Sequence, residues 1–151
     1  MAREIVFTFV DSGVSARAVL LDDAAPKTCA MFWSILPLAG ECWHGAYSGT
    51  VAAMFFDPSI IVEEENATTY FQTGDVIYTH YEPNVRHGHP EPVSEVYWAY
   101  DRYCRPLIPG HGGPPVANIF GQFVGDPSAF YAMCRALQRS GSKQLEIRRA
   151  E

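Results

Sequence analysis

Residues 116–149 read VANIFGQFVGDPSAFYAMCRALQRSGSKQLEIRR, and they place a strand, a helix and a second strand in direct succession. Asp126 and Pro127 predict where the helix starts, with Asp126 as its N-cap and Pro127 as its first residue. Gly141 suits its C-terminal end. Residues 143–149 then form a closing strand with alternate apolar residues. Four residues spaced i, i+3, i+4 and i+7 give the helix one apolar stripe: Phe130, Met133, Cys134 and Leu137.

The first third of the chain predicts a helix of the same kind. Two aspartates and two alanines precede Pro26, which suits a first helical turn. Pro37 ends the helix, since the residue before a proline avoids the α region. Its apolar stripe has the same spacing: Cys29, Phe32, Trp33 and Leu36. Each helix can therefore cover only one apolar surface, and the two cannot form a helical bundle.

The rest of the chain has the alternation and turn residues of short strands. Eight strands are predicted, over residues 3–10, 15–21, 41–47, 51–57, 76–81, 96–104, 116–124 and 143–149. Many strands with two one-sided helices favour a mainly β fold, a closed barrel of about eight strands whose open ends the amphipathic helices cover. No repeat or change in composition marks a boundary, so we expect a single domain over residues 1–151.

The composition narrows the choice of partners. Apolar residues make up 48% of the 151 and charged residues 19%, which is typical of a globular protein. Nine Phe, eight Tyr and three Trp favour strands and a ligand-lined interior. The net charge of −6 provides no basic surface for phosphate groups, so nucleic acid is not an expected partner.

The cysteines and the hydropathy pattern predict a cytoplasmic protein. No C-x-x-C motif joins any of the four cysteines, Cys29, Cys42, Cys104 and Cys134. No charged segment followed by an apolar run opens the chain, and no stretch of 18 apolar residues occurs, so we expect neither a signal peptide nor a membrane partner. Free thiols in a reducing compartment follow from this interpretation.

Two segments resemble the cyclophilins. Residues 20–32 carry an acidic-Ala-Pro-Lys-Thr step into an aromatic helix, and residues 118–124 (NIFGQFV) precede a helix and a last strand. The closer resemblance is to bacterial cyclophilin-like proteins of uncharacterised function, the DUF3830 family. It is carried by residues 3–21, 25–28 (APKT), 32–33 (FW), 36–37 (LP) and 44–49 (HGAYSG). This resemblance implies an eight-stranded barrel with capping helices.

The chain departs from the cyclophilins where they catalyse prolyl isomerisation. Their Phe-His-Arg step aligns with Tyr47-Ser48-Gly49, which leaves the catalytic arginine without a counterpart. Their Gln-Gly-Gly aligns with residues 52–54, Ala-Ala-Met, and their pocket Trp and His align with Gly112 and Ala117. The arginine supplies a charge-assisted donor to the twisted amide, so we expect prolyl isomerase activity to be absent or weak.

His44, Tyr47 and Ser48 lie where the resemblance places the cyclophilin site. Together with His111 they are the predicted ligand-binding residues, and no catalytic residue is predicted. Two long irregular stretches, residues 82–95 and 105–115, are candidates for the rim of this site. The alternative is that Ser48 only turns the chain while Tyr47 packs in the barrel.

Two further motifs are too incomplete to predict chemistry. Four histidines, His80, His87, His89 and His111, lie in or near the irregular stretches, but the loop composition and the carboxylate spacing do not predict a metal site. Residues 45–49 (GAYSG) resemble the G-x-S-x-G of hydrolases, but the serine stands one place late and no helix follows. No metal and no cofactor is therefore expected.

Three functions remain open from the sequence. The first is the binding of a small molecule or a peptide in a groove near Tyr47. The second is an enzyme, a weak or divergent peptidyl-prolyl cis-trans isomerase without the usual arginine or an activity that no motif reveals. The third is an assembly module that forms a homo-oligomer through an aromatic surface.

Overall fold

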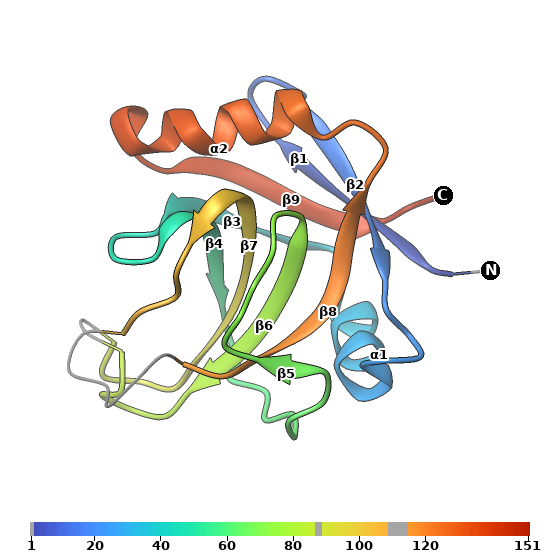
Figure 1. Ribbon diagram of the computed structural model, residues 1–151, viewed down its shortest axis with the longest axis vertical. Coiled ribbons are helices and arrows are strands. Elements are labelled where there is room, and N and C mark those ends of the chain that lie inside the picture. The colour runs from blue at the N-terminus through green and yellow to red at the C-terminus, as the bar shows by residue number, and fades with distance from the viewer. Residues whose placement is uncertain (1, 87–88, 109–114) are drawn as a thin grey trace.

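The computed structural model describes residues 2–86, 89–108 and 115–151 and contains nine strands and two helices (Figure 1). The elements are β1 (Glu4–Phe9), β2 (Ser15–Leu20), α1 (Pro26–Ile35), β3 (Leu38–His44), β4 (Gly49–Phe56), β5 (Ala67–Thr68), β6 (Asp75–Tyr81), β7 (Val93–Cys104), β8 (Ala117–Val124), α2 (Ser128–Ser140) and β9 (Lys143–Arg149).

Eight of the strands form a closed antiparallel barrel. They are hydrogen-bonded in the order β2-β1-β9-β3-β4-β7-β6-β8, and β8 pairs with β2 to close the ring. The two-residue strand β5 joins β8 outside the ring. The prediction of a mainly β, closed barrel of about eight strands with two helices is therefore confirmed.

The strand bounds differ most from the prediction, by three residues, in β3 and β7. β3 runs over Leu38–His44 rather than residues 41–47, because it begins directly after Pro37. β7 begins at Val93, so Glu95 belongs to a strand rather than to the irregular stretch 82–95. At the start of β7 the polar residues Ser94 and Glu95 are buried, so the sequence there lacks the apolar alternation by which a strand is predicted.

Large side chains fill the interior of the barrel. Phe7 on β1 lies against Trp98 on β7, with ring centroids 5.1 Å apart, and against Phe123 on β8 at the same distance. Phe130 on α2 lies 6.0 Å from Phe7 and 5.5 Å from Phe123. An eight-stranded barrel is only wide enough for its own side chains, and here aromatic rings occupy the space. The prediction of a ligand-lined interior is wrong for this reason.

The helices lie at opposite ends of the barrel, α2 across one end and α1 near the other (Figure 1). Most of the residues in their predicted stripes join the core. Phe32, Leu36, Phe130 and Leu137 are buried, while Trp33 and Met133 are half-buried against the same core. None of the helices in the described part of the chain is long and apolar enough to cross a membrane.

The predicted start of α2 is wrong by one residue. The carbonyl of Pro127 accepts the first helical hydrogen bond, from the Tyr131 N–H at 2.9 Å, so Pro127 is the N-cap. The Asp126 carboxylate still accepts the Ser128 N–H, at 3.1 Å. The aspartate therefore stabilises the start of the helix from one position further out.

Candidate functional site

A cavity of about 270 Å³ lies on the outer face of the barrel wall. Its floor comes from β4, β6 and β7, whose residues alternate between the interior and this face. Ala53 and Phe55 of β4, Glu95 and Tyr97 of β7, and Tyr81 of β6 all line it. The candidate site is therefore on the wall of the barrel, separate from the filled interior.

The register of β4 and β7 explains why there is a cavity at this point of the wall. Ala53 lies directly opposite Tyr97, and Phe55 lies directly opposite Glu95. Side chains in such pairs are close neighbours on one face of a sheet. A methyl group at residue 53, between larger side chains, leaves the space that the cavity occupies.

Two segments held together by hydrogen bonds form one rim of the cavity. The Arg105 N–H donates to the Ser48 carbonyl at 2.8 Å, and the Leu107 N–H donates to Ser48 Oγ at 3.1 Å. Gly49 allows this approach, because it has a φ of +77° and any Cβ there would overlap the Tyr103 carbonyl oxygen. The turn after β3 and the chain after β7 are thus positioned as one unit.

The structure brings three of the four predicted ligand-binding residues together. His44, Tyr47 and Ser48 all line the cavity, while His111 lies outside the described residues. Tyr47 is 57% exposed and does not pack in the barrel. Ser48 turns the chain and lines the cavity at once, so the two predicted roles of this residue are compatible.

Protein groups already occupy both ring nitrogens of His44. Its Nδ1 lies 2.9 Å from the Gly45 carbonyl oxygen, which can only accept, so Nδ1 carries the proton. Its Nε2 lies 2.7 Å from the Tyr100 hydroxyl, which donates to it when the ring is neutral. His44 therefore contributes to the wall of the cavity, and both of its ring nitrogens are already hydrogen-bonded within the protein.

Glu95 is a candidate functional residue that the sequence prediction missed. Its side chain is buried, and the Tyr81 hydroxyl donates to its Oε1 at 2.7 Å. Burial raises the pKa of Glu95 to about 6, against the opposing effects of the Tyr81 hydrogen bond and the Arg86 charge. A carboxyl group that titrates near neutral pH in a cavity is typical of functional sites. The one available signal was a single charge within residues 93–100, VSEVYWAY.

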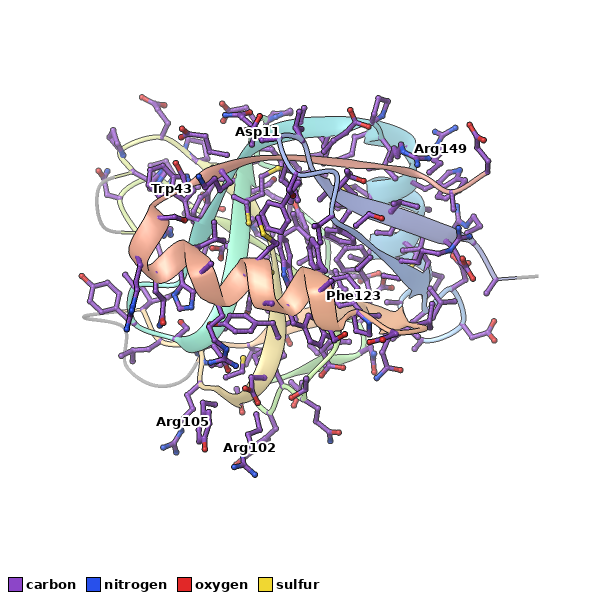
Figure 2. The ribbon with its side chains drawn as sticks, turned by 90° about the horizontal axis from the view of Figure 1, so that it is seen from above. Asp11, Trp43, Arg102, Arg105, Phe123 and Arg149 are labelled. Carbon is purple, nitrogen blue, oxygen red and sulfur yellow. The ribbon has the colours of Figure 1, made fainter. Side chains whose placement is uncertain are left out.

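Arg86 is the second missed residue. It reaches the cavity from the chain between β6 and β7, and its Cζ lies 4.0 Å from the centroid of the Phe55 ring. The sequence contains no local pattern that places residue 86 over residue 55. By contrast, Arg102 and Arg105 project away from the rest of the molecule (Figure 2).

The aromatic residues of β7 divide between the two faces of the wall. Tyr97 lines the cavity, whereas Trp98 and Tyr100 belong to the core inside the barrel. Tyr103 is exposed. The prediction that at most one face of this strand lines a cleft is confirmed.

The four cysteines are buried and unpaired, as expected of packing residues. Burial raises the pKa of Cys29, Cys104 and Cys134 to about 12, so none of these three is a thiolate near neutral pH. Over residues 2–86, 89–108 and 115–151, no three His, Cys, Asp or Glu side chains are grouped to hold a metal ion.

The solved structures that are similar to this chain include McbB and the hypothetical protein AF2241. McbB, solved in complex with tryptophan, matches 96% of this chain with a TM-score of 0.70 and 16% identity, and the match spans only 44% of the McbB chain. The hypothetical protein AF2241 from Archaeoglobus fulgidus matches 99% of this chain and 95% of its own, with a TM-score of 0.57 and 17% identity. At such identities the likeness shows the fold alone.

No curated protein matches the sequence. Residues 7–148 match the family described as "Protein of unknown function (DUF3830)". Since the match extends over nearly the whole chain, the protein belongs to the DUF3830 family.

Proposed function

We propose that this protein binds a small organic molecule in the cavity beside Tyr47. The observation that carries the proposal is a cavity of about 270 Å³ with mainly apolar walls and a few polar side chains that converge on it. Sites for small molecules have this composition, because apolar walls provide burial and the polar groups fix the orientation of the ligand.

The size of the cavity favours a compact molecule over a peptide. Pockets for drug-sized ligands measure roughly 300–1,000 Å³, and this one is at or below the small end of that range. Val51, Ala53, Phe55 and Leu107 supply apolar wall area, and Tyr47 lies exposed at the mouth.

The test is a ¹⁹F NMR titration with 4-fluorophenethyl alcohol, a neutral aromatic probe. McbB was solved with tryptophan, which makes an aromatic probe a reasonable first choice for this fold. We expect a saturable change in the fluorine signal with the wild-type protein. Ala53→Leu should remove this change, because the larger side chain fills the cavity.

The matched control is Ala136→Leu, an equal enlargement at an exposed position of α2. It should bind the probe like the wild-type protein, and thermal melting should show that both variants are folded. A probe that does not saturate the wild-type protein, or that binds folded Ala53→Leu equally well, would contradict the proposal.

A further inference from the structure

We propose that the ligand of this cavity is a zwitterionic α-amino acid with an apolar side chain, whose ammonium group binds Glu95 and whose carboxylate binds Arg86. The inference rests on the proposed function, since it names the ligand class of the same site.

Glu95 has room for a cationic donor. Tyr81 is its one hydrogen-bond partner among the described residues, whereas an ionised carboxylate can accept about four hydrogen bonds. None of the ion pairs found among these residues includes Glu95. A buried carboxylate without a partner charge is costly, and a bound ammonium group would supply that charge.

Arg86 has the complementary capacity. Its guanidinium group lies over the Phe55 ring, and stacking of this kind leaves the N–H groups at its edge free to bind a carboxylate with two bonds. No ion pair within 4.0 Å engages it among the residues that the structure describes. It thus provides a fixed positive group above the floor of the cavity.

The two charges face one cavity without neutralising each other in a direct pair. Phe55, which holds the guanidinium group, lies directly opposite Glu95 on the neighbouring strand. A ligand with one charge would pair with one of these groups and meet a like charge or a desolvated ion at the other. A ligand that carries an ammonium group and a carboxylate on the same carbon can pair with both groups.

The remaining walls determine the rest of the ligand. Val51, Ala53 and Tyr97 present apolar surface next to the charged pair. The volume of about 270 Å³ suits a single amino acid with its side chain. An amino acid with an apolar or aromatic side chain fits the charge, the polarity and the size together.

Four probes with the same fluorophenyl group test the inference by ¹⁹F NMR titration. They are 4-fluoro-L-phenylalanine, 4-fluorophenethylamine, 3-(4-fluorophenyl)propionate and 4-fluorophenethyl alcohol. We expect the zwitterion to bind roughly 10- to 100-fold more tightly than either singly charged probe, since each loses one charge-assisted contact.

Two variants assign the contacts. Glu95→Gln should weaken binding of the zwitterion and the amine by about tenfold or more. It should not weaken binding of the propionate, which no longer meets a like charge and should bind equally well or more tightly. Arg86→Gln should weaken binding of the zwitterion and the propionate by a similar factor. It should not weaken binding of the amine, which no longer meets a like charge and should bind equally well or more tightly. Arg102→Gln and Glu146→Gln, which change charges away from the cavity, should leave all four affinities unchanged.

The outcomes separate this inference from the proposed function. Equal affinity for all four probes, with loss of binding in Ala53→Leu, would overturn the amino-acid assignment and support the binding function. Binding of the zwitterion that neither Glu95→Gln nor Arg86→Gln weakens would also overturn the assignment. Failure of every probe, including the neutral alcohol, would overturn both.

Discussion

The side chain of Glu95 is a carboxyl group buried in the barrel wall, on the face opposite the core. Most buried carboxylates in proteins are paired with a cation, and Glu95 has only the Tyr81 hydroxyl among the described residues. Its ionisation therefore opposes folding. Proteins keep such groups where binding or catalysis needs them, at a cost in stability.

Replacing Glu95 by glutamine should stabilise the protein at high pH. The folded-state pKa of Glu95 is about 6, above its ordinary value of 4.5. For a raised pKa, the stabilising contribution is complete below the unfolded value and is lost as the pH rises through 6. Glu95→Gln should thus be more stable than wild type by about 2 kcal/mol at pH 8 and nearly equal to it at pH 4.

Urea denaturation of both proteins at pH 4 and pH 8 measures this difference. The glutamine amide oxygen can still accept the Tyr81 hydroxyl, so the comparison isolates the charge. The attraction between Arg86 and ionised Glu95 exists only in the wild-type protein, and its effect is already included in the Glu95 pKa of about 6. A stability difference that does not change with pH would show that Glu95 keeps an ordinary pKa.

Gly49 determines how two strands are placed, because its lack of a side chain lets the start of β4 approach the end of β7 closely. Ala at this position would combine an unfavourable positive φ with overlap between its Cβ and the Tyr103 carbonyl oxygen. Gly49→Ala should lose about 1–2 kcal/mol from the φ alone and clearly more from the overlap. Binding of 4-fluorophenethyl alcohol should weaken with it, since the rim depends on this approach.

Gly13→Ala is the matched control for that variant. Gly13 has a φ of +73°, close to the +77° of Gly49, but open space surrounds its Cβ position. Urea denaturation of the two variants therefore separates the cost of the backbone angle from the cost of the overlap. Equal losses of stability would show that the rim can move aside without a penalty.

Helix α1 receives its cap from a residue far along the chain. Its N-cap, Ala25, has no side-chain hydrogen bond, and the Glu65 carboxylate instead accepts the Thr28 N–H at 2.6 Å. We expect Glu65→Ala to cost about 1 kcal/mol of stability, as loss of a helix cap does. Glu64→Ala, at the exposed neighbouring position, should cost much less, and urea denaturation compares the two variants.

The elements that could be predicted from the sequence are those whose pattern is local. Strand β1 follows from the alternation of Ile5, Phe7 and Phe9, and both helices follow from their apolar stripes. Strand β5 has only two residues, too few for any period to show. The Glu65 cap escaped prediction because 37 residues separate it from Thr28.

The candidate site was predictable only in part for the same reason. His44, Tyr47 and Ser48 form a short continuous segment, and the resemblance to a known family placed them at a site. Glu95 was not predicted as a site residue, because the Pro-rich stretch before it made the start of β7 unrecognisable in the sequence. Arg86 reaches Phe55 through loop geometry, which no local pattern encodes.

At the scale of the whole molecule, the packed core and the cavity lie on opposite faces of the barrel wall. Its interior is closed by α1 and α2 and filled with aromatic side chains, so changes in ligand contacts need not disturb the core. The cavity uses the opposite face of the same strands, where Tyr97 and Glu95 alternate with the core residues Val96 and Trp98. One wall can therefore hold both a rigid core and a polar site.

This arrangement also bears on prolyl isomerisation, the alternative function that the sequence leaves open. Rotation about an X-Pro bond faces a barrier of roughly 18–20 kcal/mol, which a cationic donor near the prolyl nitrogen lowers. Removing one well-placed donor of this type costs roughly 3–4 kcal/mol of transition-state stabilisation in other enzymes. The resemblance aligns the Phe-His-Arg step of the cyclophilins with Tyr47, Ser48 and Gly49, in the turn after β3 and at the start of β4, and none of these three residues supplies a positive charge.

We expect no acceleration of X-Pro isomerisation by this protein, although Arg86 brings a positive charge to the cavity. The charge of Arg86 is opposed by Glu95, the residue opposite Phe55, and ionised Glu95 weakens the field that a twisted amide would experience. NMR exchange measurements on several X-Pro peptides at pH 7.5 test this, with an ordinary cyclophilin as the positive control. If catalysis were observed and Arg86→Gln abolished it while Arg102→Gln did not, Arg86 would be the catalytic donor, and the cavity would be an isomerase site whose arginine comes from a different segment of the chain.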